Sequence, residues 1–167
     1  MTDILTFTKP ETRWLSNMAY VNIEHDGIVY PSTENFYQAM KYCKTDMVEG
    51  ANGNKIPIRV FISKLTPSES KRFSKENRMT NVPAFDDNKI KIMRVAQRQK
   101  YSQEPFRSKL LATGDAHLEE GNWWKDSFWG TDIKTREGKN MLGRLIMQVR
   151  DELRAQENES AKTVQAF

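Results

Sequence analysis

The sequence predicts a single, mostly helical domain with one β-hairpin, and three observations support this fold. The chain has 167 residues, of which 38% are hydrophobic and 29% charged, and this length and composition are typical of one compact domain. Several segments carry helix-start signals or apolar residues at helical spacing. One segment near the N-terminus alternates apolar and polar residues around an Asp-Gly pair, which is typical of a β-hairpin.

The hairpin is expected between residues 19 and 31, with a tight type I′ turn at the Asp-Gly pair of residues 26–27. Pro31-Ser32-Thr33 follows and indicates the start of a helix, because a hydroxyl side chain can accept hydrogen bonds from the first free N–H groups of a helix. This helix is expected to run from about residue 33 to residue 44. Three of its polar residues share one face, namely Glu34, Gln38 and Lys41.

The rest of the chain is expected to alternate loops and helices. Residues 45–57 contain several Gly and Asn residues and are expected to form an exposed, mobile loop. Further helices are expected at residues 66–77, 86–101, 106–111 and 140–156, the second of them capped by Asp86 and Asp87. Residues 157–167 lose the apolar period and are expected to be disordered, so that the domain spans residues 1–156.

Composition limits the setting and the partners of the protein. The single Cys43 offers neither a disulfide framework nor a cysteine metal cluster, and it fits a reducing, cytoplasmic compartment. No apolar run reaches the roughly 20 residues of a membrane helix, and the N-terminus lacks the order of a signal peptide, so no membrane association is expected. The net charge of +4 favours polyanionic partners.

Familiar catalytic and cofactor motifs are absent from the sequence, including the P-loop, the G-x-S-x-G elbow and the H-E-x-x-H zinc motif. The chain has only 2 histidines, so no metal site is expected. Carboxylates, a lysine and aromatic residues are the remaining candidates. Glu34, Gln38 and Lys41 would place an acid, an amide and an amine along one wall, although Glu and Lys are equally common on a solvated helix face.

Two further groups of residues have both a functional and a structural interpretation. Asp126 and Asp132 flank Trp129 in the segment richest in aromatic residues, where a carboxylate can acquire a raised pKa or stabilise a cation. The same aromatic residues can instead fill a core. The helix expected at residues 86–101 carries a basic stripe that can bind phosphates or face water. Its members are Lys91, Arg94 and Arg98.

A series of separated motifs runs along most of the chain. They are Trp14-Leu15-Ser16-Asn17-Met18, the Asp26-Gly27 turn, the run from Ser32 to Lys41, the run from Leu110 to Asp115, Phe128-Trp129-Gly130, and the run from Gly138 to Gly143. In their order and spacing these motifs resemble the NADAR domain family, also called YbiA-like. The resemblance covers about residue 7 to residue 153.

The resemblance implies an α+β, mostly helical domain that cleaves the N-glycosidic bonds of ribosides. Family substrates are of two classes: ribosylamino-pyrimidine intermediates of riboflavin synthesis, and ADP-ribose attached to guanine in nucleic acid. The family's glutamate, helical lysine and acidic residue match Glu34, Lys41 and Asp126, which are therefore expected to be catalytic. A family tryptophan falls at Phe85, which keeps a stacking face but loses the indole N–H, and the histidine after the glutamate is replaced by Asn35.

The implied chemistry suits these residue types. Cleavage of an N-glycosidic bond develops positive charge at the anomeric carbon of ribose, so nearby carboxylates stabilise the transition state. Glu34 and Asp126 would divide two tasks, stabilising the cation or activating water, and protonating the leaving nitrogen. Lys41 would bind a substrate oxygen or phosphate or, when neutral, attack the anomeric carbon. Neither a cofactor nor a metal is expected.

Substrate contacts are expected from Asn17, Gln38, Phe85, Arg94, Trp129, Asp132 and Asn140. The leading hypothesis is removal of ADP-ribose from guanine bases of DNA, in a repair or antitoxin-like role, because the basic balance, the basic stripe and Phe85 favour a polyanionic substrate. One alternative is hydrolysis of a phosphorylated ribosylamino-pyrimidine. The other is a non-catalytic module that binds ADP-ribose or NAD derivatives. The expected partner is therefore ADP-ribosylated nucleic acid or a small phosphorylated riboside, and the oligomeric state is left open.

Overall fold

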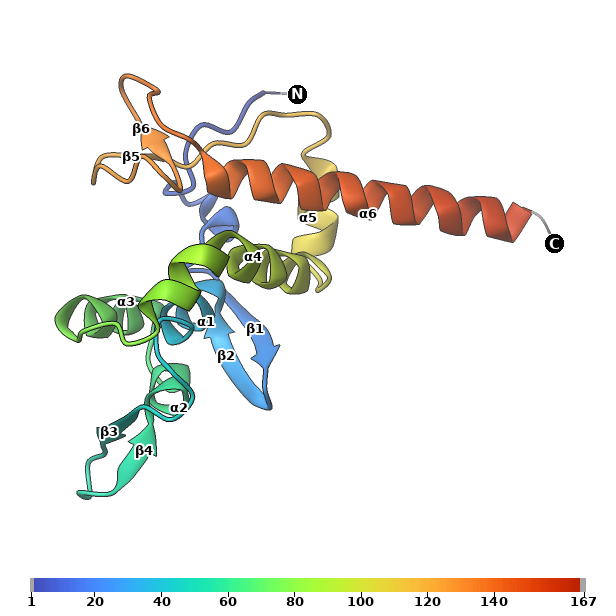
Figure 1. Cartoon of the computed structure of the whole chain (residues 1–167). Coiled ribbons are helices and arrows are strands. Elements are labelled where there is room, and N and C mark those ends of the chain that lie inside the picture. Colours follow the sequence, from blue (N-terminus) through green and yellow to red (C-terminus); the bar gives the residue numbers. More distant parts are fainter. Residues whose placement is uncertain (1, 166–167) are drawn as a thin grey trace. The chain divides into compact units, whose positions relative to one another are not determined.

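The computed structural model describes residues 2–165, which divide into two compact units. The central unit comprises Asn17–Lys100, and the terminal unit combines the residues up to Ser16 with those from Tyr101 onward. Helices dominate both units, and every sheet among the described residues has two strands (Figure 1).

The central unit contains β1 (Tyr20–His25), β2 (Ile28–Ser32), α1 (Thr33–Ala39), β3 (Met47–Glu49), β4 (Lys55–Pro57), α2 (Ile58–Ser63), α3 (Pro67–Glu76) and nearly all of α4 (Val82–Tyr101). The terminal unit contains the 3₁₀ helix η1 (Arg13–Leu15), α5 (Phe106–Ala112), β5 (Gly121–Asn122), β6 (Thr131–Asp132) and α6 (Met141–Gln165). None of the described helices combines the length and apolar character needed to cross a membrane.

The predicted hairpin is confirmed. β1 and β2 pair in antiparallel fashion, and His25 lies opposite Ile28 across the turn. Asp26 and Gly27 have φ angles of 51° and 74°, the left-handed backbone that a type I′ turn requires at both central positions. Ile23 in β1 is fully buried, so the alternating pattern marks the inward face correctly.

Helix α1 begins where the sequence predicts but is shorter than expected, ending at Ala39 instead of residue 44. Ser32 caps it, because its side chain accepts a hydrogen bond from the N–H of Asn35 at 3.0 Å. All seven residues of α1 are buried, since the helix packs against β2, α2 and α3. The alternative of a solvated helix face for Glu34 and Gln38 is therefore wrong.

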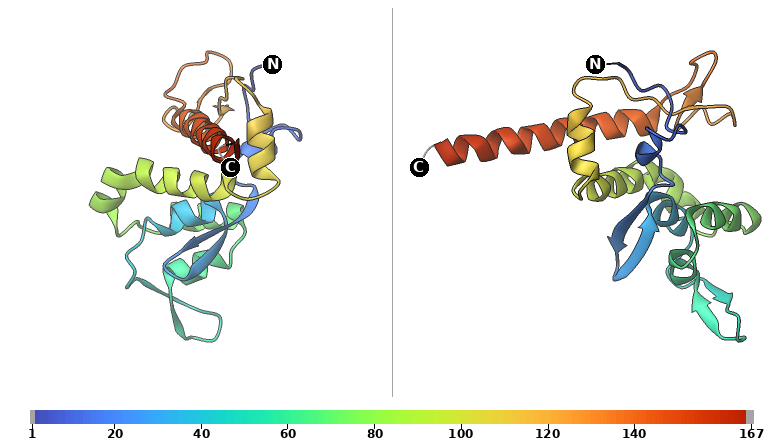
Figure 2. Two further views of the ribbon diagram at one scale, coloured as in Figure 1. Left: turned by 90° about the vertical axis from the view of Figure 1, so that its right-hand side faces the viewer. Right: turned by 180° about the vertical axis from the view of Figure 1, so that it is seen from behind.

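The predicted loop at residues 45–57 is instead a second hairpin, formed by β3 and β4, and Figure 2 shows it from two further sides. Gly53 has a φ of 74° in its turn, and Val48 pairs with Ile56. Three-residue strands are too short to show a period of two. Helix α2 was not expected either, because it has six residues and follows Pro57 without a side-chain cap.

Helix α3 confirms its prediction, with a capping box between Thr66 and Glu69. Helix α4 begins at Val82, so the expectation that Asp86 and Asp87 cap it is wrong. Pro83 explains the earlier start, because proline fits the first turn of a helix, where no N–H donor is needed. The earlier start places Phe85, which is 4% exposed, in the opening turn of α4.

The terminal unit is built on α5 and α6. The apolar face of α6 is buried as predicted, through Leu142, Leu145, Ile146, Val149 and Leu153. The helix continues to Gln165, through most of the segment that was expected to be disordered, and residues 166–167 lie outside the described residues. Residues 151–165 lack Gly and Pro and contain several Glu, Gln and Ala residues, which favour helix even without apolar packing.

Candidate active site

Glu34 and Gln38 form a buried acid–amide pair on α1. Glu34 lies in the first turn and is 6% exposed, and Gln38 is 4% exposed. The Nε2 group of Gln38 donates a hydrogen bond to Oε1 of Glu34 at 2.6 Å, as the spacing of four residues allows. Within the described residues, Oε1 of Gln38 is buried and has no hydrogen-bond partner. A buried acceptor of this kind is costly unless a water molecule or a ligand supplies a donor.

Lys41 was expected on the same helix, but it lies in the turn after α1, where its N–H donates to the carbonyl of Gln38 at 3.2 Å. The shorter helix thus places this amine beyond the helix face that holds Glu34 and Gln38, in an aromatic setting. Its Nζ lies 5.4 Å from the ring centroid of Tyr37 and 5.8 Å from that of Phe85. Burial lowers the pKa of Lys41, the negative charge of Glu34 opposes this shift, and the positive charge of Lys71 adds to it. A lowered pKa increases the neutral fraction of an amine near pH 7, and only the neutral amine is a nucleophile.

Phe85 and Tyr37 form an aromatic wall beside this amine. Their ring centroids are 5.1 Å apart, with an interplanar angle of 62°. Both rings are buried, because they lie between α1 and the start of α4. The structure thus places Phe85 beside Lys41, and its stacking role toward a substrate stays a prediction.

Asn17 fixes the beginning of α1. Its Oδ1 accepts hydrogen bonds from Oγ1 of Thr33 at 2.9 Å and from Nε2 of Gln97 at 2.7 Å. Its backbone carbonyl accepts the N–H of Glu34 at 3.1 Å. Sequence analysis missed Gln97, although a glutamine one turn after Met93 on the inward stripe of α4 is a signal for a buried polar contact. Asn17 and Gln97 therefore hold Glu34 in position.

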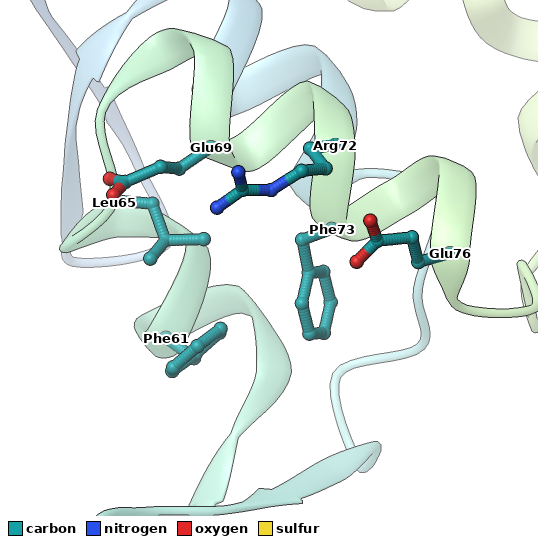
Figure 3. Close-up of a pocket in the computed structure, with 6 residues that line it drawn as sticks. All are labelled: Phe61, Leu65, Glu69, Arg72, Phe73 and Glu76. Atoms are coloured by element: carbon teal, nitrogen blue, oxygen red, sulfur yellow. The ribbon is translucent and has the colours of Figure 1, made fainter.

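The central unit thus brings together five of the predicted residues, namely Asn17, Glu34, Gln38, Lys41 and Phe85. Arg94 lies further along α4 and is half-buried. A hollow on the surface of the central unit lies elsewhere. It is lined by Phe61 of α2, by Leu65 just after α2, and by Glu69, Arg72, Phe73 and Glu76 of α3 (Figure 3). None of the predicted site residues lines that hollow.

The two predicted carboxylates of the terminal unit close turns of the backbone. Oδ1 of Asp126 accepts the N–H groups of Phe128 and Trp129 at 3.1 and 2.9 Å. Oδ1 of Asp132 accepts those of Lys134 and Thr135 at 2.8 and 2.9 Å. These hydrogen bonds lower the pKa of Asp132. Both carboxylates therefore stabilise the backbone of the terminal unit, and their role toward a substrate stays a prediction.

Asn140 also has a structural task in the terminal unit. It adopts a φ of 48° just before α6. Its Oδ1 accepts the N–H of Glu120 at 3.1 Å, and its Nδ2 donates to the carbonyl of Leu118 at 2.9 Å. This amide bridges two backbone groups, which explains why an asparagine precedes α6.

Sequence analysis missed an ion pair in this unit. Arg136 donates from Nε to Oε1 of Glu119 at 2.6 Å, its Nη2 donates to Oε2, and Thr131 also donates to this carboxylate. Burial opposes these contacts, but together they lower the pKa of Glu119. The partners are more than ten residues apart in sequence, and no local pattern connects them.

The aromatic segment of the terminal unit does not fill a core throughout. Trp129 is half-buried and packs edge-on against Phe128, with ring centroids 5.0 Å apart. Trp123 and Trp124, in contrast, are 65% and 44% exposed. For these two residues the core-filling interpretation is wrong.

The family model for the NADAR domain matches residues 6–154, which span both units. The chain belongs to the NADAR family. This match confirms the resemblance that the separated motifs carry, and it covers nearly the whole chain.

Several NADAR relatives have established names. The chain is 32% identical over 139 residues to N-glycosidase YbiA of Escherichia coli, covering 83% of this chain and 79% of the relative. It is 31% identical over 140 residues to an N-glycosidase of Nostoc punctiforme, covering 83% and 84%. It is 33% identical over 141 residues to a riboflavin biosynthesis protein of Vibrio vulnificus, but it spans only 35% of that longer protein.

A solved NADAR structure has the same fold. The NMR structure of E. coli YbiA matches with a TM-score of 0.73 and 28% sequence identity, over 95% of this chain and 90% of that chain. The expected α+β, mostly helical fold class is therefore confirmed. N-glycosidase activity is the activity for which several members of this family are named.

Proposed function

We propose that this protein hydrolyses the N-glycosidic bond between ADP-ribose and guanine in DNA. The observation that carries the proposal is the buried Glu34–Gln38 pair beside Lys41, whose pKa burial lowers. A carboxylate can stabilise the charge that develops in riboside cleavage, a buried acceptor can bind a hydroxyl group, and an amine with a lowered pKa is more often neutral and able to attack.

The reaction proceeds at the anomeric carbon of the ribose. As the bond to the guanine nitrogen breaks, positive charge develops on the sugar, and the carboxylate of Glu34 stabilises it. The neutral amine of Lys41 forms a bond to the anomeric carbon while the electron pair of the broken bond leaves with the guanine nitrogen, which takes up a proton. The ribose ring then opens to give an imine to Lys41, the ring oxygen taking up a proton as the nitrogen loses one. Water hydrolyses this imine, so that free ADP-ribose, the regenerated amine of Lys41 and unmodified guanine result.

The neighbouring groups bind and orient the substrate. Oε1 of Gln38 accepts a hydrogen bond from a ribose hydroxyl, which satisfies the buried acceptor. The rings of Tyr37 and Phe85 provide a face for a planar base. The role of Asp126 as the acid stays a prediction, because its carboxylate belongs to the terminal unit and closes a turn of the backbone through Oδ1.

The preference for a nucleic acid rests on charge. The central unit, which carries Glu34 and Lys41, has 14 Lys and Arg against 9 Asp and Glu, whereas the rest of the chain has 12 against 13. The positive excess of the protein therefore belongs to the unit that holds the acid–amide pair. A substrate with several phosphates is attracted to such a unit.

A second candidate is hydrolysis of a small phosphorylated ribosylamino-pyrimidine. It is favoured by the names of relatives, which include riboflavin biosynthesis proteins of Vibrio vulnificus and Zea mays. This reaction would use Glu34 and Lys41 in the same way but would need no contact with a polynucleotide. A third candidate is a module that binds ADP-ribose without turnover. It is less favoured, because binding alone does not require the lowered pKa of Lys41.

The decisive experiment compares the substrates directly. The protein is incubated with an oligonucleotide that carries ADP-ribosyl guanine and, in a parallel reaction, with a ribosylamino-pyrimidine phosphate. The masses of the products are then measured by mass spectrometry. We expect the unmodified oligonucleotide mass with wild type and with Glu49→Gln, an exposed control in β3. Glu34→Gln should abolish this product.

Lys41 is tested by trapping with borohydride. Wild-type protein that turns over substrate should yield a covalent protein–sugar adduct, and Lys41→Ala should not. Cleavage of the pyrimidine riboside alone would replace the proposal by the second candidate. Binding of ADP-ribose with no turnover of either substrate would replace it by the third.

A further inference from the structure

The loop that joins β5 and β6 displays two tryptophan side chains to solvent. Trp123 is 65% exposed and Trp124 is 44% exposed. Their ring centroids are 5.1 Å apart, and the planes meet at 82°. Large aromatic side chains that gather on a surface mark interaction sites, because burying them against a partner releases the water they order.

The same loop is held in a fixed conformation by its own hydrogen bonds. Asn122 is fully buried, and its side chain donates to the carbonyl of Asp126 at 2.9 Å and accepts the N–H of Asp126 at 3.1 Å. The carboxylate of Asp126 holds the next turn. Lys125, at the tip, adopts a φ of 65°. The two indoles are therefore carried on a preorganised turn, which reduces the entropy lost on binding.

Charge around the loop complements an anionic partner. Lys125, Lys134 and Lys139 are exposed cations of residues 122–139, and Nζ of Lys139 lies 5.4 Å from the ring centroid of Phe128. Among the acids of this stretch, Asp126 and Asp132 accept backbone N–H groups. With Glu137 these are the three acids of the stretch, and Arg136, paired with Glu119, is its fourth cation, so residues 122–139 carry a formal charge of +1 with the exposed lysines beside the indoles.

We infer that the loop of residues 122–130 is a stacking platform for the unpaired nucleobases of single-stranded nucleic acid. The inference rests on the proposed function and names the surface that holds the polynucleotide. Indole faces stack on any base, and lysines beside them pair with the phosphates. A small riboside offers neither the second base nor the chain of phosphates that such a platform requires.

The test measures the affinity for an unmodified oligothymidylate, which the enzyme cannot cleave, by isothermal titration calorimetry. Trp123→Ala with Trp124→Ala should weaken binding by about 5- to 150-fold, the effect of losing one stacked base or more. Tyr20→Ala is the matched control, because Tyr20 is also 65% exposed but lies in the central unit. It should leave the affinity unchanged.

Two further double variants test the inference if the double alanine variant fails to fold. Trp123→Phe with Trp124→Phe retains planar rings and should restore most of the affinity. Lys125→Gln with Lys134→Gln should reduce the slope of log affinity against log salt by about 1.4, because each phosphate contact with a single strand contributes about 0.7.

Two readouts separate this inference from the proposed function. Oligothymidylate binding that is identical in wild type and the alanine variant overturns the platform, even if ADP-ribosyl guanine is hydrolysed. Tryptophan-dependent binding without hydrolysis of the modified oligonucleotide supports the platform and overturns the proposed function. Self-association that disappears in the alanine variant, with no affinity for the oligonucleotide, would make the loop a protein interface and also overturn the inference.

Discussion

Lys41 is the residue of the candidate site whose charge state the structure changes. Burial and the charge of Lys71 lower its pKa, and the charge of Glu34 raises it. A nucleophilic lysine must be neutral to react, so the rate should rise with pH as the amine loses its proton. The acidic limb of the pH profile therefore belongs to Lys41 in the proposed mechanism.

Replacing Lys71 with glutamine should shift that limb to higher pH. The substitution removes a positive charge that disfavours protonated Lys41, so the pKa of Lys41 rises and more alkaline solution is needed to obtain the neutral amine. The measurement is kcat/KM against pH for wild type and for the variant. Lys75→Gln, on the same helix α3, is the control. A limb that stays in place or moves to lower pH would assign the profile to another group.

At the scale of elements, α1 depends on its cap. Ser32 accepts the N–H of Asn35 and donates to Oδ1 of the same residue at 2.6 Å, and Nδ2 of Asn35 donates to the carbonyls of Ile62 and Leu65. The cap thus links the end of the first hairpin to α1 and to the end of α2. A change at Ser32 affects all three elements.

Ser32→Ala should lower the free energy of unfolding by about 1 to 2 kcal/mol, the usual cost of losing an N-cap side chain. Urea titration followed by circular dichroism measures this loss. Ser68→Ala, at an exposed position in α3, should change stability by less than about 0.5 kcal/mol. Equal losses in the two variants would mean that the cap contributes nothing beyond the removal of a hydroxyl group.

Elements whose signals are local were predictable from the sequence. The first hairpin depends on two turn residues with positive φ, and α3 on a capping box. The hairpin of β3 and β4, and α2 after it, were not predictable, because the strands have three residues each and α2 has six residues without a side-chain cap. The start of α4 was misplaced because Asp86 resembles a cap, whereas Pro83 marks the actual first turn.

The candidate site divides in the same way. The contact between Glu34 and Gln38 follows from a spacing of four residues in a helix, so it could be predicted. For Gln97 the sequence indicates a buried polar contact, but it does not reveal the partner, because Asn17 is eighty residues away in sequence. The turns closed by Asp126 and Asp132 depend on backbone N–H groups, whose directions no side-chain pattern reveals.

At the scale of the whole molecule, the fully buried Lys100 links stability to pH. Burial lowers its pKa in the folded protein to about 7, from an ordinary value of 10.5. Between these two values the unfolded chain binds more protons than the folded one, so the contribution of Lys100 to the free energy of unfolding increases with pH. Below about pH 7 both states are protonated, and the cost of the buried charge is fully present.

Lys100→Met should remove this contribution. We expect the variant to gain stability relative to wild type near pH 7, and the difference between the two proteins to decrease as the pH approaches 10.5. Chemical denaturation of both proteins at several pH values measures the difference. A difference that does not depend on pH would show that Lys100 keeps the same charge in both states.

The exposed pair of Trp123 and Trp124 also gives the protein an optical reporter of its own. The chain has 4 tryptophans, and Trp14 and Trp129 are more buried than these two. Tryptophan emission at long wavelength therefore originates largely from one loop. Its intensity can report ligand binding to that loop in real time, without any label on the protein or its ligand.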